Sequence, residues 1–140
     1  MKNTACIAAI FFFCLVPVLP FAEEYDENSD GKSDKWVIFG SNGTRRIEID
    51  RDYDGMVDYA VVYDKDANLK EERLDFNHDG EMDDFYYYID SILVRREIDS
   101  NYDTKVDIWV YIREGVYIEK YEMDTDFDGN IDTVKDYNKK

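Results

Sequence analysis

Cysteine and histidine are scarce in this 140-residue chain, and their scarcity narrows what the protein can be. Both cysteines, Cys6 and Cys14, lie in an apolar N-terminal stretch, so the rest of the chain has no disulfide and no cysteine metal site. The only histidine, His78, occupies a loop position that holds Ser, Tyr or Phe elsewhere, which favours a variable, outward-facing residue. No serine lies in a nucleophile motif such as Gly-x-Ser-x-Gly. We therefore expect no catalytic residues and a protein that is not an enzyme.

The first 22 residues have the layout of a secretory signal peptide. Lys2 precedes an apolar run that ends at Leu19, and Ala22 offers a cleavage site. The run is shorter than the ~20 residues that a membrane-spanning helix needs. We expect residues 1–22 to be removed and 23–140 to form one exported domain, with no membrane span after cleavage. An uncleaved anchor is the alternative; the expected location is secreted, periplasmic or at the cell surface.

Acidic residues outnumber basic ones by 33 to 17, and the excess is concentrated in a repeated loop pattern. The pattern is Asp-x-Asp/Asn-x-Asp-Gly-x-x-Asp, and its fourth copy has Thr104 in place of the glycine. A constant spacing of 24 or 25 residues marks an internal repeat. So acidic a surface makes nucleic acid an unexpected partner. The copies begin at Asp26, Asp50, Asp75, Asp99 and Asp124, and are called loops 1 to 5 (26–34, 50–58, 75–83, 99–107 and 124–132).

Each loop places oxygen-bearing side chains at positions 1, 3, 5 and 9, the order in which a short loop wraps a hard cation such as calcium. At these four positions, loops 2 and 5 carry four Asp each and the others three, which makes seventeen carboxylates. Neighbouring carboxylates repel one another unless a cation is present. The predicted metal ligands are Asp26, Asn28, Asp30, Asp34, Asp50, Asp52, Asp54, Asp58, Asp75, Asn77, Asp79, Asp83, Asp99, Asn101, Asp103, Asp107, Asp124, Asp126, Asp128 and Asp132.

Two points stay open at this level. The loops could be metal-free turns, because Asp and Asn side chains also stabilise turns by bonding to their own backbone. Glu48, Glu97 and Glu122 each stand two residues before the first Asp of a loop. They could supply an extra ligand, or they could pair with neighbouring Arg and Lys.

Runs rich in aromatic and β-branched residues lie between the loops and predict strands. We expect an all-β fold, an antiparallel meander of about eight or nine strands, in which repeated β-hairpins are joined by the acidic metal-binding loops along one edge. A small β-barrel or a two-layer sandwich is the alternative. The predicted strands are 36–39, 45–49, 59–63, 69–74, 85–89, 92–98, 108–112, 116–123 and 133–137.

The loops resemble EF-hand-type calcium loops, and more closely the shortened loops of dockerins, thrombospondin type 3 repeats and Asp-rich repeats of exported bacterial proteins. The resemblance implies that the Met56 carbonyl, at position 7 of loop 2, joins the side-chain ligands. It also implies positive φ at position 6, which makes loop 4, with Thr104, the weakest site. Position 12 lacks the bidentate Glu and the flanks read as strands, so binding in the ~10⁻⁴ to 10⁻³ M range of extracellular modules is expected.

The sequence thus predicts an exported calcium-binding β-repeat protein that acts as a binding or surface-structural module. A metal-independent β-hairpin scaffold for protein interaction is the alternative. The expected partners are divalent cations, together with a protein, a glycan or a second copy that pairs with an unpaired edge strand.

Overall fold

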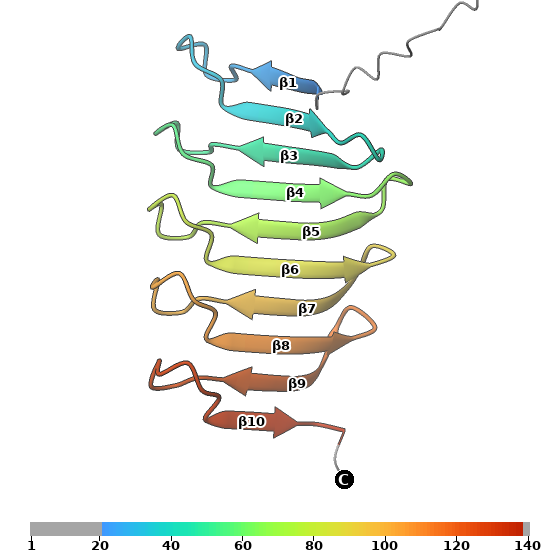
Figure 1. Cartoon of the computed structure of the whole chain (residues 1–140), viewed down its shortest axis with the longest axis vertical. Helices are drawn as coiled ribbons and strands as arrows, with labels where there is room; N and C mark the ends of the chain where they lie inside the picture. Colours follow the sequence, from blue (N-terminus) through green and yellow to red (C-terminus); the bar gives the residue numbers. More distant parts are fainter. Residues whose placement is uncertain (1–20, 139–140) are drawn as a thin grey trace, which may run out of the picture.

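A computed structural model describes residues 21–138, which form a single open β-sheet (Figure 1). Ten strands lie in chain order and each pairs antiparallel with the next, which confirms the predicted all-β meander. Because β1 and β10 lie at opposite ends of the strand order, the described sheet is neither a closed barrel nor a sandwich. The strands are β1 (Phe21–Tyr25), β2 (Lys35–Phe39), β3 (Arg45–Ile49), β4 (Tyr59–Tyr63), β5 (Leu69–Leu74), β6 (Asp84–Ile89), β7 (Ile92–Ile98), β8 (Ile108–Arg113), β9 (Tyr117–Met123) and β10 (Thr133–Asp136).

Strand β1 was not among the predicted strands. It pairs with β2 over its whole length, from Phe21 opposite Phe39 to Tyr25 opposite Lys35. Its first two residues fall within the predicted signal peptide, so a cut after Ala22 would remove part of the strand. The remainder of that predicted segment, residues 1–20, lies outside the described residues.

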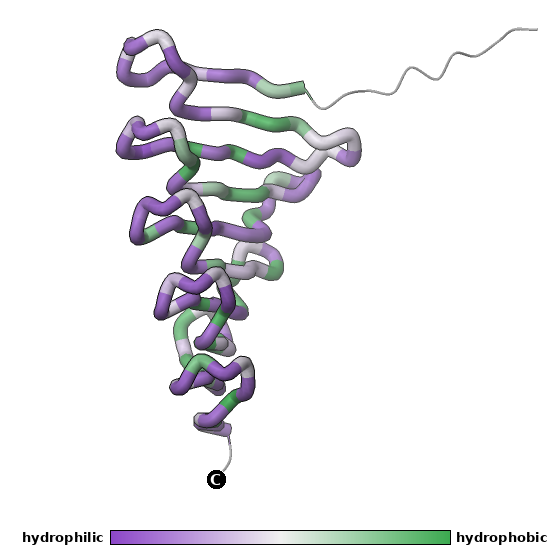
Figure 2. The backbone as a smooth tube through the Cα atoms, turned by 60° about the vertical axis from the view of Figure 1, so that its left-hand side comes forward, coloured by the Kyte–Doolittle hydropathy of each residue, from purple (hydrophilic) through white to green (hydrophobic). Residues whose placement is uncertain are grey.

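Long acidic loops and short turns alternate along the meander, so all five loops lie on one side of the sheet, on the left in Figure 1. Two strands separate one loop from the next, which places the loops roughly 10 Å apart. Figure 2 looks more directly at this side and shows the hydrophilic loops as a column. The column is the loop row expected from the repeat.

The sheet is one layer thick and has almost no apolar core. Among the apolar residues of the described chain, only Ala60 and Val61 are buried. Most of the buried residues are instead aspartates: Asp34, Asp50, Asp58, Asp75, Asp83, Asp84, Asp99, Asp107 and Asp124. The sheet is therefore held by its backbone ladder, by cross-strand side-chain pairs and by these carboxylates.

Asp84 is the one fully buried acid, and it lies just outside loop 3 on β6. The Arg96 guanidinium donates to both carboxylate oxygens, at 2.8 and 2.5 Å, and the Tyr86 hydroxyl donates a further bond at 2.9 Å. Burial, followed by the bond to Asp84, raises the pKa of Tyr86 to about 12. The buried charge is thus neutralised and bonded by residues of β6 and β7.

Residues 21–138 contain no helix that is long and apolar enough to cross a membrane.

Candidate metal-binding loops

All five loops follow the same backbone path, with two residues in the left-handed region. At position 6, φ is +72° for Thr104 and between +90° and +99° for the glycines, so the prediction of positive φ there is confirmed. Position 4 is also left-handed, with φ between +59° and +68°. This second left-handed residue was not predicted, because Ser29, Tyr53, His78, Tyr102 and Phe127 share no side-chain property that indicates it.

The carboxylate at position 9 ties the end of each loop to its beginning by accepting hydrogen bonds from backbone N–H groups there. In loop 2, Asp58 Oδ2 accepts bonds from the backbone N–H groups of Arg51 and Asp52, at 2.5 and 3.2 Å. These bonds compensate its burial, which leaves Asp58 only 3% exposed. The same oxygen plays this role in Asp34, Asp83, Asp107 and Asp132.

The carboxylate at position 1 spans the turn. Asp50 Oδ1 accepts the N–H of Tyr53 at 2.7 Å and its Oδ2 accepts that of Gly55 at 2.8 Å. Asp75 and Asp99 make the same pair of bonds, and positions 3 and 5 accept the N–H groups two residues further on. Because a carboxylate oxygen has more than one lone pair, these bonds orient the acids and leave acceptor capacity for an ion.

Consecutive loops are also joined through the backbone. The N–H at position 1 of each later loop donates to the carbonyl oxygen at position 9 of the loop before it. The distances are 2.8 Å for Asp50 to Asp34, 2.9 Å for Asp75 to Asp58, and 2.8 Å for both Asp99 to Asp83 and Asp124 to Asp107. Backbone hydrogen bonds therefore connect each acidic loop to the next along the row.

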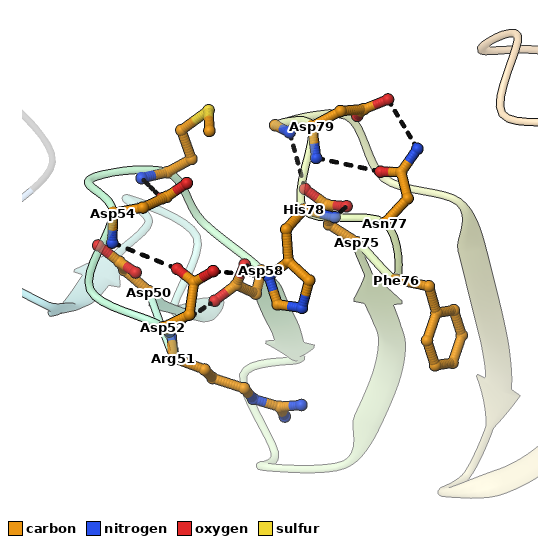
Figure 3. Close-up of polar contacts among 12 residues, drawn as sticks. Asp50, Arg51, Asp52, Asp54, Asp58, Asp75, Phe76, Asn77, His78 and Asp79 are labelled. Carbon is orange, nitrogen blue, oxygen red and sulfur yellow. Dashed lines mark hydrogen bonds and ion pairs between the residues drawn. The ribbon is translucent and has the colours of Figure 1, made fainter.

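Three carboxylates converge in the two loops that carry four Asp. One oxygen from each of Asp50, Asp52 and Asp54 lies within 4.8 Å of the others, and Asp124, Asp126 and Asp132 do the same in loop 5. Calcium–oxygen distances of 2.3–2.6 Å allow oxygens around one ion to lie up to about 5 Å apart. Both clusters could therefore hold a metal ion, and Figure 3 shows the loop 2 carboxylates side by side.

Loop 5 differs from loops 2 to 4 in one bond. Asp124 Oδ2 accepts the N–H of Gly129 at 2.7 Å, but its Oδ1 is buried and has no hydrogen-bond partner among residues 21–138. The negative charges of Asp128 and then Asp132 raise the pKa of nearby Asp126. A buried acceptor without a donor, beside a carboxylate crowded by others, is the arrangement that a cation would stabilise.

In the other three loops position 3 is an asparagine. The amide oxygens of Asn28, Asn77 and Asn101 accept the N–H of position 5, at 2.8, 3.0 and 3.0 Å. The predicted ligand sets of all five loops remain predictions; the oxygens of Asp58 and Asp128 are not part of the two three-carboxylate clusters.

No protein-family model, curated protein or solved structure matches the chain. Any functional assignment therefore depends on the loops and the sheet themselves.

The side chains of the glutamates that precede the loops pair with residues of their own strands and do not point into the loops. Each forms an ion pair with the basic residue two positions earlier on its own strand: Glu48 with Arg46 at 3.0 Å, Glu97 with Arg95 at 3.2 Å and Glu122 with Lys120 at 2.5 Å. Tyrosine hydroxyls donate to two of them, Tyr87 to Glu97 and Tyr111 to Glu122. Of the two possibilities that the sequence left open, the structure shows pairing on the sheet face.

His78 is exposed, as predicted from its position, but its ring also contacts the neighbouring loop. Its Nδ1 lies 2.9 Å from Asp58 Oδ1 and 3.0 Å from Asp52 Oδ2, both in loop 2 (Figure 3). The hydrogen bond to Asp58 is the main cause that raises the pKa of His78. Sequence reasoning missed this contact because it depends on how loop 3 stacks on loop 2, some twenty residues away along the chain.

Proposed function

We propose that this protein is an exported calcium-binding β-repeat protein. Calcium would hold the row of loops on one side of the sheet, and the sheet would serve as a binding or surface-structural module. The observation that carries the proposal is in loop 5, where Asp124 Oδ1 is buried without a donor among the described residues, beside Asp126 and Asp132. Such an oxygen costs about 1–3 kcal/mol, which a bound cation would remove.

The fold explains why an ion would matter. A one-layer sheet whose buried apolar residues are Ala60 and Val61, within the described chain, gains little from hydrophobic burial. With a site dissociation constant of ~10⁻⁴ M, millimolar calcium would add about 1.4 kcal/mol for each occupied loop. Because the backbone joins one loop to the next, binding would stiffen the whole row.

A metal-independent hairpin scaffold is the second candidate, and a specific observation favours it. In loops 2, 3 and 4 both oxygens of the position 1 carboxylate already accept backbone N–H bonds. Those turns can be held without an ion. On this reading the exposed sheet faces contact a protein or glycan partner, and the acidic loops only connect the hairpins.

Replacing Asp126 with Asn separates the two candidates by the sign of its effect. Asp126 is crowded by Asp128 and Asp132, so losing its charge should leave stability unchanged or raise it in a chelator. In millimolar calcium the same change removes a charged ligand and should lower the melting temperature. The control is Asp66→Asn, in the turn between β4 and β5, which should behave alike in both buffers.

The calcium proposal fails if the melting curves of the unmodified protein superimpose in calcium and in chelator. It also fails if Asp126→Asn has the same effect in both buffers. Either result would favour the metal-independent hairpin scaffold. Magnesium should stabilise much less than calcium, because it requires a tighter octahedral geometry and retains its waters.

A further inference from the structure

The junction between loops 2 and 3 brings a histidine and two aspartates to one point. His78 comes from loop 3, whereas Asp52 and Asp58 come from loop 2, and one donor atom of each lies within 4.8 Å of the others. Figure 3 shows the imidazole turned toward the two carboxylates. The three side chains converge from two repeats, so this is not a property of any single loop.

The repeat pattern singles out this junction. Position 3 of the upstream loop is Asn28, Asn77 or Asn101 at the other three junctions, and among the four upstream loops only loop 2 has a carboxylate there, Asp52. Position 4 of the downstream loop is an aromatic residue without a metal-binding nitrogen at those junctions, namely Tyr53, Tyr102 or Phe127. The histidine and the additional carboxylate thus occur together at one junction of four.

The donor set differs in chemistry from that of the calcium loops. Calcium binds oxygen ligands, whereas imidazole nitrogen combined with carboxylate suits transition ions such as zinc. Zinc–nitrogen and zinc–oxygen distances near 2.1 Å place tetrahedral ligands about 3.4 Å apart. His78 Nδ1 lies 2.9 and 3.0 Å from the two carboxylate oxygens, so they need to separate by only a few tenths of an ångström.

The two carboxylates are held by the loop itself. Asp58 Oδ2 accepts the N–H groups of Arg51 and Asp52, which leaves Oδ1 facing His78. Asp52 Oδ1 accepts the N–H of Asp54 at 3.2 Å, which leaves Oδ2 facing His78. Outer bonds of this kind orient metal ligands and support affinity.

We propose that Asp52, Asp58 and His78 form a binding site for a divalent transition ion of the zinc class. The site bridges loops 2 and 3, and a water or another small ligand would complete its tetrahedron. This zinc-site proposal rests on the proposed function only because Asp52 and Asp58 are also among the calcium ligands predicted for loop 2. Zinc and calcium would therefore compete at loop 2, whereas loop 5 would be left to calcium.

His78 is the only histidine of the chain, which makes the test direct. Zinc chloride is titrated into the full-length protein labelled with ¹⁵N-histidine, without calcium and in millimolar calcium. We expect a large shift of the Nδ1 resonance at one equivalent of zinc, and no comparable shift with calcium alone. An unchanged Nδ1 resonance in saturating zinc overturns the site.

The matched variant is His78→Tyr, which carries the residue found at this position in loops 2 and 4. It should weaken the tightest zinc binding seen by calorimetry at least about tenfold, since even outer partners of a ligand contribute that much. The double variant Asn77→Asp/Tyr102→His should create a second zinc site between loops 3 and 4. Equal zinc affinity of the parent and His78→Tyr refutes the proposal.

The two proposals can fail separately. If calcium leaves the melting curve unchanged but zinc shifts Nδ1, the calcium function fails and the transition-ion site stands. If Asp126→Asn shows the expected reversal while His78→Tyr binds zinc as the parent does, the calcium function stands and the zinc site is overturned.

Discussion

Thr104 is a residue of the loop row whose replacement should make the protein more stable both with and without calcium. Its φ of +72° lies in the left-handed region, where a β-branched residue is strained by about 1–3 kcal/mol. The side chain is exposed, and the N–H donates to Asp99 Oδ2 at 2.6 Å. Glycine keeps that N–H and removes the strain.

The expected gain is smaller than the strain. Glycine is more flexible in the unfolded chain, which offsets roughly 0.5–1 kcal/mol of the benefit. Thr104→Gly should therefore raise the free energy of unfolding by about 0.5–2 kcal/mol, or the melting temperature by roughly 2–8 °C. If the loop relaxes when no ion is bound, part of this gain should appear instead as tighter calcium binding, tenfold for each 1.4 kcal/mol.

The opposite substitution provides the control. Gly55 has a φ of +99°, and a Cβ built there meets no atom within 4 Å, so Gly55→Thr introduces backbone strain without a clash. It should destabilise by an amount similar to the gain in Thr104→Gly. Gly80 is unsuitable, because its Cβ would lie 2.8 Å from Met56 Sδ.

Both variants are read by urea unfolding followed through tryptophan fluorescence and circular dichroism, in calcium and in chelator. The strain argument is refuted if Thr104→Gly is no more stable than the parent in either buffer while Gly55→Thr is no less stable. Calorimetric titration of the same proteins shows how much of the effect belongs to calcium affinity.

Two further predictions concern the sheet. The pKa of Tyr86 is the usual 10 in the unfolded chain and about 12 in the folded protein, so its contribution to stability should be complete below pH 10 and lost as the pH rises through 12. Tyr86→Phe should flatten that part of an alkaline unfolding profile. An unchanged profile would contradict the assignment. Arg96→Met strands the buried Asp84 carboxylate and should cost about 3–5 kcal/mol in urea unfolding. Asp84→Ile/Arg96→Tyr, which copies Ile108 and Tyr121 of the next repeat, should cost clearly less; equal losses would mean that the ion pair is not the cause.

The sequence alone determined the features that depend on local chemistry. Strand and loop alternate with the repeat because β-branched and aromatic runs favour extended backbone, and Asp, Asn and Gly favour turns. Positive φ at position 6 was implied by the resemblance to EF-hand-type loops, and Thr104 obeys the same geometry. The antiparallel meander followed because short connections make consecutive strands neighbours.

The tertiary structure decided what depends on contacts between repeats. An open sheet and a closed one have the same local pattern. What distinguishes them is whether β1 pairs with β10, and in the described sheet these two strands lie at opposite ends. The contact of His78 with loop 2 depends on how the loops stack, whereas the pairing of Glu48 with Arg46 along one strand depends on side-chain direction. That Asp124 Oδ1 is buried without a donor among the described residues is likewise visible only in the structure. The residues that differ between repeats, such as Thr104 and His78, can be read from the sequence, but their contacts with neighbouring repeats are set by how the hairpins stack.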